Sequence, residues 1–120
     1  MRVLIIEDEP NIIEAIRFIL SRAGWRVDTH ADGSSALDAV RTRAPDLIIL
    51  DVQMPEMDGC QTASMLKVRK KTREIPVIFL NAAYKTDEFQ QKGYDVGAAD
   101  YLLKPIDDNL LLNKLTAYFR

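Results

Sequence analysis

The sequence has 120 residues, of which 48% are hydrophobic and 28% charged, values typical of one globular domain and not of a disordered chain. Its 16 basic and 18 acidic residues give a formal net charge of −2, which argues against nucleic-acid binding through bulk positive charge. One cysteine, Cys60, excludes an internal disulfide and is consistent with a cytoplasmic location. No apolar run reaches the roughly 18 residues that a membrane span needs, so we expect no membrane contact.

Short apolar runs alternate with longer amphipathic segments along the whole chain. Continuous apolar runs are typical of buried strands, and apolar residues three or four apart are typical of helices. In chain order the pattern predicts a strand over 3–6, a helix from Pro10 to a C-cap at Gly24, a strand over 25–29, a helix around 36–40, a strand over 47–50, a loop over 51–58, a helix over 59–73, a strand over 77–80, a helix over 86–96, a strand over 100–103 and a final helix reaching 119.

This order is a strand–helix unit repeated five times. Strands that are apolar throughout and joined by helices predict a parallel sheet covered on both faces, with right-handed crossovers. We therefore expect an α/β fold of the doubly wound, flavodoxin-like (βα)5 class, with a five-stranded parallel sheet in the order 2-1-3-4-5. One domain is expected to span residues 1–120.

Polar residues stand where four of these strands end. Glu7 and Asp8 follow the first strand, Asp51 the third, Asn81 the fourth and Lys104 the fifth. Ligands of open parallel sheets bind at the carboxyl ends of the strands, where the winding reverses between strands 1 and 3. We therefore expect the three carboxylates to converge there.

Three like charges in one cleft repel one another, and a cation allows all of them to ionise. Mg²⁺ suits such a site because it prefers oxygen ligands and commonly combines carboxylates, waters and phosphate oxygens. An aspartate can act as a nucleophile and become an aspartyl phosphate, and phosphoryl transfer needs mainly positioning and charge neutralisation. His30 is the only histidine, and we expect it to have a structural or surface role.

Three motifs carry a family resemblance: Glu7-Asp8-Glu9, Asp51-Val52-Gln53-Met54-Pro55-Glu56-Met57-Asp58-Gly59 and Lys104-Pro105. In order and spacing they resemble the receiver domains of bacterial response regulators, the phosphorylated modules of two-component systems that include chemotaxis receivers. The resemblance covers essentially the whole chain.

The resemblance implies a role for each matching position. Asp51 would be the phosphoacceptor, and Lys104 would contact the phosphoryl group. Mg²⁺, or Mn²⁺ in its place, would be bound by Asp8 directly, by Glu7 through water, by Asp51 and by the backbone carbonyl of Gln53.

One position departs from the family pattern. Asn81 stands where receivers usually have Thr or Ser, whose hydroxyl moves to the phosphoryl group while an aromatic side chain, here Tyr101, turns inward. Asn keeps an N–H donor but is longer and carries a carbonyl dipole. Losing one well-placed hydrogen bond to a charged group costs about 1.5–3 kcal/mol, whereas a complete two-state shift needs about 5.5 kcal/mol. We therefore expect phosphorylation to persist with weaker switching.

The resemblance also implies partners. The phosphoryl donor would be a sensor histidine kinase or a phosphotransfer protein, and signalling would use the face built by helix 86–96, strand 100–103 and the final helix. A homodimer through that face and an output domain after Arg120 are further expectations. The chain would not be an enzyme, beyond catalysing its own phosphorylation and dephosphorylation.

Two other classes of function occur on this fold. A degenerate receiver that binds partners without phosphorylation is the alternative that Asn81 favours. A flavin-binding or hydrolytic enzyme is disfavoured, because acids stand after the first strand in place of a glycine-rich phosphate loop, and Gln53 replaces the second Asp of a phosphohydrolase motif.

Overall fold

The computed structural model describes residues 2–51, 66, 72, 74–82, 100–104 and 106–118, without the side chains of residues 33, 34, 81, 82, 101, 103, 104 and 118. The elements in chain order are β1 (Arg2–Ile6), α1 (Pro10–Arg22), β2 (Arg26–His30), α2 (Gly33–Thr42), β3 (Leu47–Asp51), β4 (Val77–Ala82), β5 (Asp100–Lys104) and α5 (Asp108–Tyr118). The expected helices over 59–73 and 86–96 lie outside the described residues, except Leu66, which is helical, and Thr72, which lies in a turn.

All five strands belong to one parallel sheet in the order β2-β1-β3-β4-β5, as predicted. The chain adds β2 on one side of β1 and then returns to add β3 on the other side. The winding therefore reverses between β1 and β3, and their carboxyl ends form the edge at which ligands of such sheets bind. The predicted flavodoxin-like fold class is confirmed.

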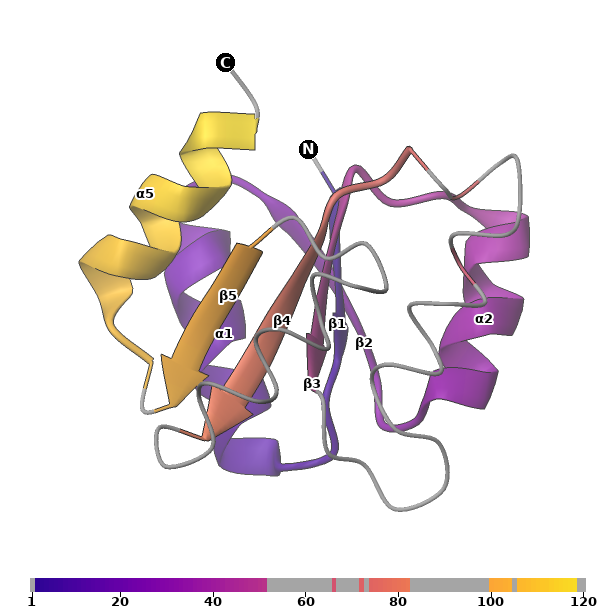
Figure 1. The fold of residues 1–120 in the computed structure, drawn as a ribbon, viewed down its shortest axis with the longest axis horizontal. Coiled ribbons are helices and arrows are strands. Elements are labelled where there is room, and N and C mark those ends of the chain that lie inside the picture. The colour runs from indigo at the N-terminus through magenta and orange to yellow at the C-terminus, as the bar shows by residue number, and fades with distance from the viewer. Residues whose placement is uncertain are drawn as a thin grey trace.

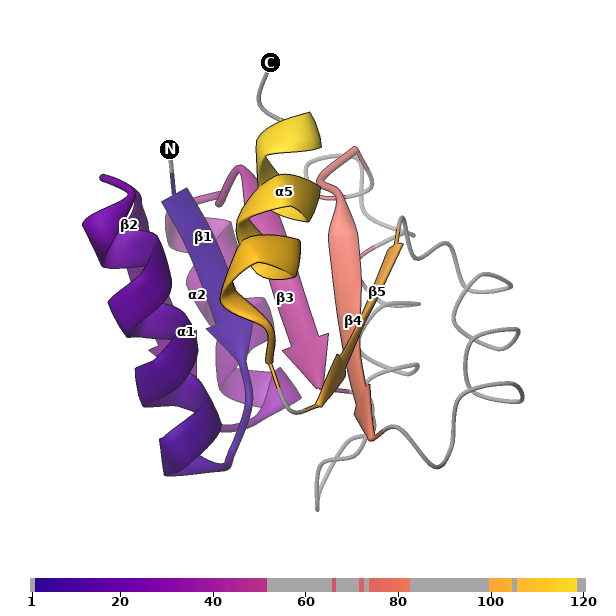
Figure 2. The ribbon, with the colours of Figure 1, turned by 90° about the vertical axis from the view of Figure 1, so that its left-hand side faces the viewer.

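Helices cover both faces of this sheet. In Figure 1, α2 lies on one side of the strands and α1 and α5 lie on the other. In Figure 2, α1 and α5 lie in front of the strands and α2 lies behind them. The core cluster on the α1 and α5 face consists of Val3, Ile5, Ile16, Ile19, Leu20, Leu47, Ile49, Ile78, Leu80, Leu102, Leu111 and Leu115. The core cluster on the α2 face consists of Leu4, Ile6, Ala36, Leu37, Val40, Ile48, Leu50, Leu66, Ile75, Val77 and Phe79.

The two clusters explain why the strands read as unbroken apolar runs. Consecutive side chains of a strand point to opposite faces, so neighbours such as Ile48 and Ile49 enter different clusters. A polar residue at either position would be buried in an apolar layer, which costs free energy unless it is hydrogen-bonded. Burial on both faces of the sheet is therefore the reason that these strands are apolar at every position.

Local signals set the ends of the helices. Pro10 is the first residue of α1, where its missing N–H costs nothing. Gly24 follows the end of α1 with φ +88°, a conformation that glycine adopts without strain. At the start of α2, the side chain of Asp32 accepts a hydrogen bond from the N–H of Ser35 at 2.7 Å, which caps the helix.

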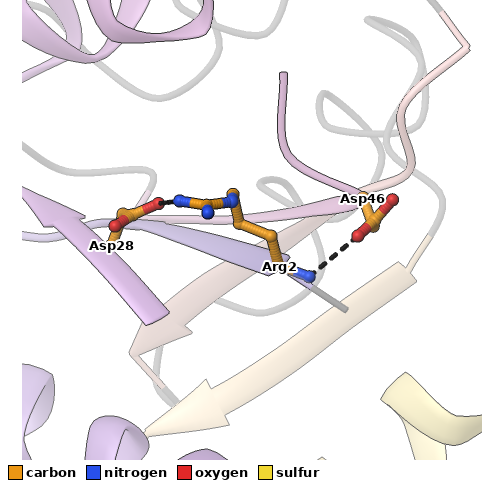
Figure 3. A network of polar contacts seen from close by, with 3 residues as sticks. All are labelled: Arg2, Asp28 and Asp46. Atoms are coloured by element: carbon orange, nitrogen blue, oxygen red, sulfur yellow. Dashed lines mark hydrogen bonds and ion pairs between the residues drawn. The ribbon is translucent and has the colours of Figure 1, made fainter. Parts of the chain in front are cut away.

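Arg2 joins three strands at the amino ends of the sheet (Figure 3). Its guanidinium contacts the carboxylate of Asp28 on β2 at 2.7 Å. Its backbone N–H donates to the carboxylate of Asp46, just before β3, at 2.8 Å, and its carbonyl accepts from the N–H of Asp46 at 2.8 Å. This network lies at the end of the sheet opposite to the acidic residues.

The ends of several strands differ from the prediction by one or two residues. Asp51, Asn81 and Lys104 were expected just after their strands, but they belong to β3, β4 and β5. The reason is backbone pairing, because Asp51 lies opposite Leu80 and Asn81 opposite Leu103 in the register. The polar side chains led to the prediction that each strand ends before them, whereas backbone pairing with the neighbouring strand sets the actual end.

Candidate functional site

An acidic cluster lies at the carboxyl ends of β1 and β3. Glu7, Asp8 and Asp51 each offer a carboxylate oxygen, and these oxygens all lie within 4.8 Å of one another. Glu7 is 0% and Asp51 is 3% exposed, whereas Asp8 is exposed. Among the described residues, these three form the only group of three or more acidic, histidine or cysteine side chains that lie close enough together to hold a metal ion. The predicted convergence of the three acids is confirmed.

The loop after β1 holds the first acids in place through its backbone. The N–H of Glu7 donates to the carbonyl of His30 at 3.0 Å, which continues the β1–β2 pairing beyond the end of β1. The N–H of Glu9 donates to the Glu7 carboxylate at 3.2 Å. Helix α1 then begins at Pro10. Its amino end carries a partial positive charge, which favours anionic groups in the residues just before it.

Asp51 reaches the cluster from the last position of β3. Every residue of this strand is buried, and the Asp51 backbone is paired with Leu80 of β4. A residue inside a paired strand has little freedom to move. The Asp51 backbone is therefore held in place at the end of β3, and Asp8 lies at the exposed rim of the same cluster.

The donor set suits a hard divalent cation. Three carboxylates supply oxygen ligands only, and two of them are largely withdrawn from water. Mg²⁺ is commonly held by one or two carboxylates together with water and phosphate oxygens. The residues present therefore fit a Mg²⁺ site with an exposed side at Asp8.

The other predicted site residues are placed by their backbones only. Asn81 lies in β4, and Tyr101 and Lys104 lie in β5, at the same edge of the sheet as Asp51 or close to it. Their side chains lie outside what the structure describes. Gln53 also lies outside the described residues.

Sequence reasoning missed two backbone contributions to this site. The carbonyl of His30 accepts the Glu7 N–H, and the N–H of Glu9 contacts the Glu7 carboxylate. His30 is distant from the acids in sequence, and backbone groups carry no residue-type signal. Only the β1–β2 register, which pairs Ile6 with His30, indicates the first contact.

Solved receiver structures share this fold. The Vibrio cholerae chemotaxis protein CheY4 superposes with a TM-score of 0.91 at 32% identity, covering 98% of this chain and 97% of that one. The receiver domain of the Pseudomonas aeruginosa sensor histidine kinase PA1611, solved with a magnesium ion coordinated in its active site cleft, superposes with a TM-score of 0.88 at 27% identity, covering 98% of this chain and 95% of that one. The fold and the acidic site thus define the chain as a receiver-type α/β protein.

The family assignment rests on sequence as well. The model of the response regulator receiver domain matches residues 3–116, and the chain belongs to this family. Relatives include the transcriptional regulatory protein DltR of Streptococcus agalactiae, 37% identical over 96% of this chain and 50% of the relative. Another is the alkaline phosphatase synthesis transcriptional regulatory protein PhoP of Bacillus subtilis, 34% identical over 99% of this chain and 48% of the relative. The chain spans about half the length of these curated relatives.

In the part of the chain that the structure describes, no helix combines the length and apolar character needed to cross a membrane.

Proposed function

We propose that the chain accepts a phosphoryl group on Asp51 and acts as the switch of a two-component phosphorelay. The observation that carries this proposal is the convergence of Glu7, Asp8 and Asp51, with carboxylate oxygens within 4.8 Å at the winding reversal of the sheet. Like charges held together destabilise the fold unless a cation offsets their repulsion, which favours a cation-binding role for this cluster. Membership of the receiver family supports the same reading.

In this proposal the chain's own residues position the reaction. An Asp51 carboxylate oxygen attacks the phosphorus of a phosphohistidine, a P–O bond forms, and the P–N bond breaks with its electron pair leaving on the imidazole, which takes up a proton. Asp8, Glu7 and the carbonyl of Gln53 would complete a Mg²⁺ or Mn²⁺ site with Asp51, and Lys104 would contact the phosphoryl oxygens. The cation, when bound, neutralises charge on the carboxylates and on the transferred group.

Partners follow from the same proposal. The phosphoryl donor is a sensor histidine kinase or a phosphotransfer protein. The curated relatives are about twice as long as this chain, and several are named as transcriptional regulators, which supports an output domain C-terminal to Arg120. The signalling face comprises β5, α5 and the helix predicted over 86–96, and this face also provides the surface for a homodimer.

Acetyl phosphate tests the chemistry without the kinase. The chain is incubated with acetyl phosphate and Mg²⁺ or with acetyl phosphate and EDTA, and its intact mass is measured. We expect a gain of one phosphoryl group that needs Mg²⁺ and is absent in Asp51→Asn. Asp38→Asn is the matched control, because Asp38 is an exposed aspartate on α2, and this variant should be phosphorylated like the wild type.

The same experiment addresses the alternative that Asn81 favours, a receiver that binds partners without being phosphorylated. No mass gain in the wild type, under conditions in which a known receiver is phosphorylated, would support that alternative and reject phosphoacceptance. A mass gain retained in Asp51→Asn would reject Asp51 as the acceptor.

A further inference from the structure

Glu7 is held from two directions in the acidic cluster. Its own N–H donates to the carbonyl of His30 at 3.0 Å, and its carboxylate Oε1 accepts from the N–H of Glu9 at 3.2 Å. The side chain is fully buried. A buried carboxylate that accepts a backbone hydrogen bond has fewer orientations available than an exposed one.

Glu9 is itself fixed by the start of α1. Its carbonyl accepts the N–H of Ile13 at 3.1 Å, and its φ of −89° and ψ of 113° place it as the N-cap. Pro10 follows and has no N–H to offer. The Glu9 side chain makes no capping hydrogen bond and is exposed. Residue 9 therefore acts on the cluster through its backbone N–H, whatever side chain it carries.

We propose that Glu9 is a positioning residue, whose backbone N–H orients the Glu7 carboxylate for a divalent cation. This inference rests on the metal site of the proposed function. Hydrogen bonds to ligating carboxylates set their orientation, and losing such a partner typically weakens metal binding about 10–100-fold. The start of α1 thereby contributes to metal affinity through the backbone N–H of Glu9, a group that residue 9 has whichever side chain it carries, proline excepted.

Two substitutions at residue 9 separate the N–H from the side chain. Glu9→Ala removes the charge and keeps the N–H, whereas Glu9→Pro removes both. The Glu9 φ of −89° lies near the proline range of about −65 ± 15°, so residue 9 itself needs only a small adjustment of φ. Mg²⁺ dissociation constants are measured by calorimetry on unphosphorylated protein. We expect binding by Glu9→Pro to be about 10-fold weaker than by Glu9→Ala, the lower end of the range for such partners.

The same pair in a Glu7→Ala background tests whether the effect passes through Glu7. We expect the difference between proline and alanine to vanish there, and a difference that persists overturns the proposal. Equal Mg²⁺ affinities of Glu9→Pro and Glu9→Ala, with wild-type binding intact, also overturn it while leaving the proposed function standing. Absence of Mg²⁺ binding by the wild type rejects the metal site itself, and this inference with it.

Amide hydrogen exchange provides a readout that does not depend on the proline variant folding. In the wild type the Glu9 amide should exchange more slowly than in Glu7→Ala, because Glu7→Ala removes its acceptor. If Glu9→Pro loses the cooperative thermal transition that Glu9→Ala retains, this comparison decides the matter. Equal exchange of the Glu9 amide in both proteins overturns the proposal.

Discussion

Arg2 and Asp46 are joined by two hydrogen bonds at the amino ends of β1 and β3. The Arg2 N–H donates to the Asp46 carboxylate and the Asp46 N–H donates to the Arg2 carbonyl, both at 2.8 Å. The Asp46 carboxylate thus accepts the Arg2 N–H, as a backbone carbonyl would if the pairing of strands continued beyond the end of β3. A charge-assisted bond of this kind is stronger than a neutral one.

We expect Asp46→Ala to lower the free energy of unfolding by about 1 kcal/mol, below the range of about 1.5–3 kcal/mol for bonds to charged groups, because the pair is solvent-exposed. Urea unfolding followed by far-UV circular dichroism measures it. Asp46→Asn keeps an oxygen acceptor and should cost less. Asp28→Asn, which weakens only the partly exposed ion pair with Arg2, should cost about 0.5 kcal/mol. A larger loss for Asp28→Asn than for Asp46→Ala would contradict this ranking.

Phe79 and Phe18 provide a matched pair of aromatic residues. Phe79 is fully buried in the core cluster on the α2 face, whereas Phe18 is 62% exposed on α1. Phe79→Ala should cost about 3–5 kcal/mol because it leaves a cavity. Phe18→Ala should cost at most about 1 kcal/mol, the scale of its contact with Arg22, whose guanidinium lies 5.3 Å from the ring centre. Urea unfolding of both variants tests the contrast, and similar losses would contradict the assigned burial.

Repulsion among the three acids predicts that Asp51→Asn stabilises the chain when no divalent cation is present. Two unit charges about 5 Å apart repel by about 3 kcal/mol at an effective dielectric constant of about 20, and solvent at the rim reduces this value. In EDTA we therefore expect the free energy of unfolding of Asp51→Asn, measured by urea unfolding, to exceed that of the wild type by about 1 kcal/mol. A loss of stability in EDTA would show that attraction to neighbouring groups outweighs the repulsion.

Mg²⁺ should reduce or reverse that difference. A ligand at 100 times its dissociation constant stabilises the folded state by about 2.7 kcal/mol, and the wild type retains all three carboxylates that bind the cation in our proposal. Asp8→Ala should lose most of the Mg²⁺ response. Thermal unfolding with increasing Mg²⁺ measures the effect, and equal shifts for the wild type and Asp8→Ala would count against Asp8 as a ligand.

Asn81→Thr should strengthen transmission from Asp51. Asn81 lies in β4 opposite Leu103, and Tyr101 lies opposite Phe79 on the same pair of strands. Thr restores the hydroxyl that the resemblance assigns to this position, and the coupling should rise by about 1.5–3 kcal/mol, the value of one hydrogen bond to a charged group. Amide NMR shifts on adding beryllium fluoride and Mg²⁺ should then grow over residues 84–119. Wild-type shifts there as large as those near Asp51 would contradict weak coupling.

Hydrophobic periodicity determined most of the fold. Runs such as 47–50 and 77–80 are apolar at every position, and only a strand covered on both faces can bury both sets of side chains. Proline and glycine marked where α1 begins and ends, since Pro10 suits a first helical turn and Gly24 a positive φ. The meeting of Glu7, Asp8 and Asp51 followed from strand order alone.

Tertiary structure decided what depends on neighbours in space. Strand β3 includes Asp51 because this residue pairs with Leu80, and β4 includes Asn81 because this residue pairs with Leu103. The pairing between strands therefore extends beyond the apolar runs of the sequence. Burial distinguishes Glu7 and Asp51 from the exposed Asp8, although all three are acids in the sequence. The contacts from His30 and Glu9 to Glu7 involve backbone groups, which every residue type shares. The sequence by itself therefore determined which side chains meet, and the folded backbone decided how they are held.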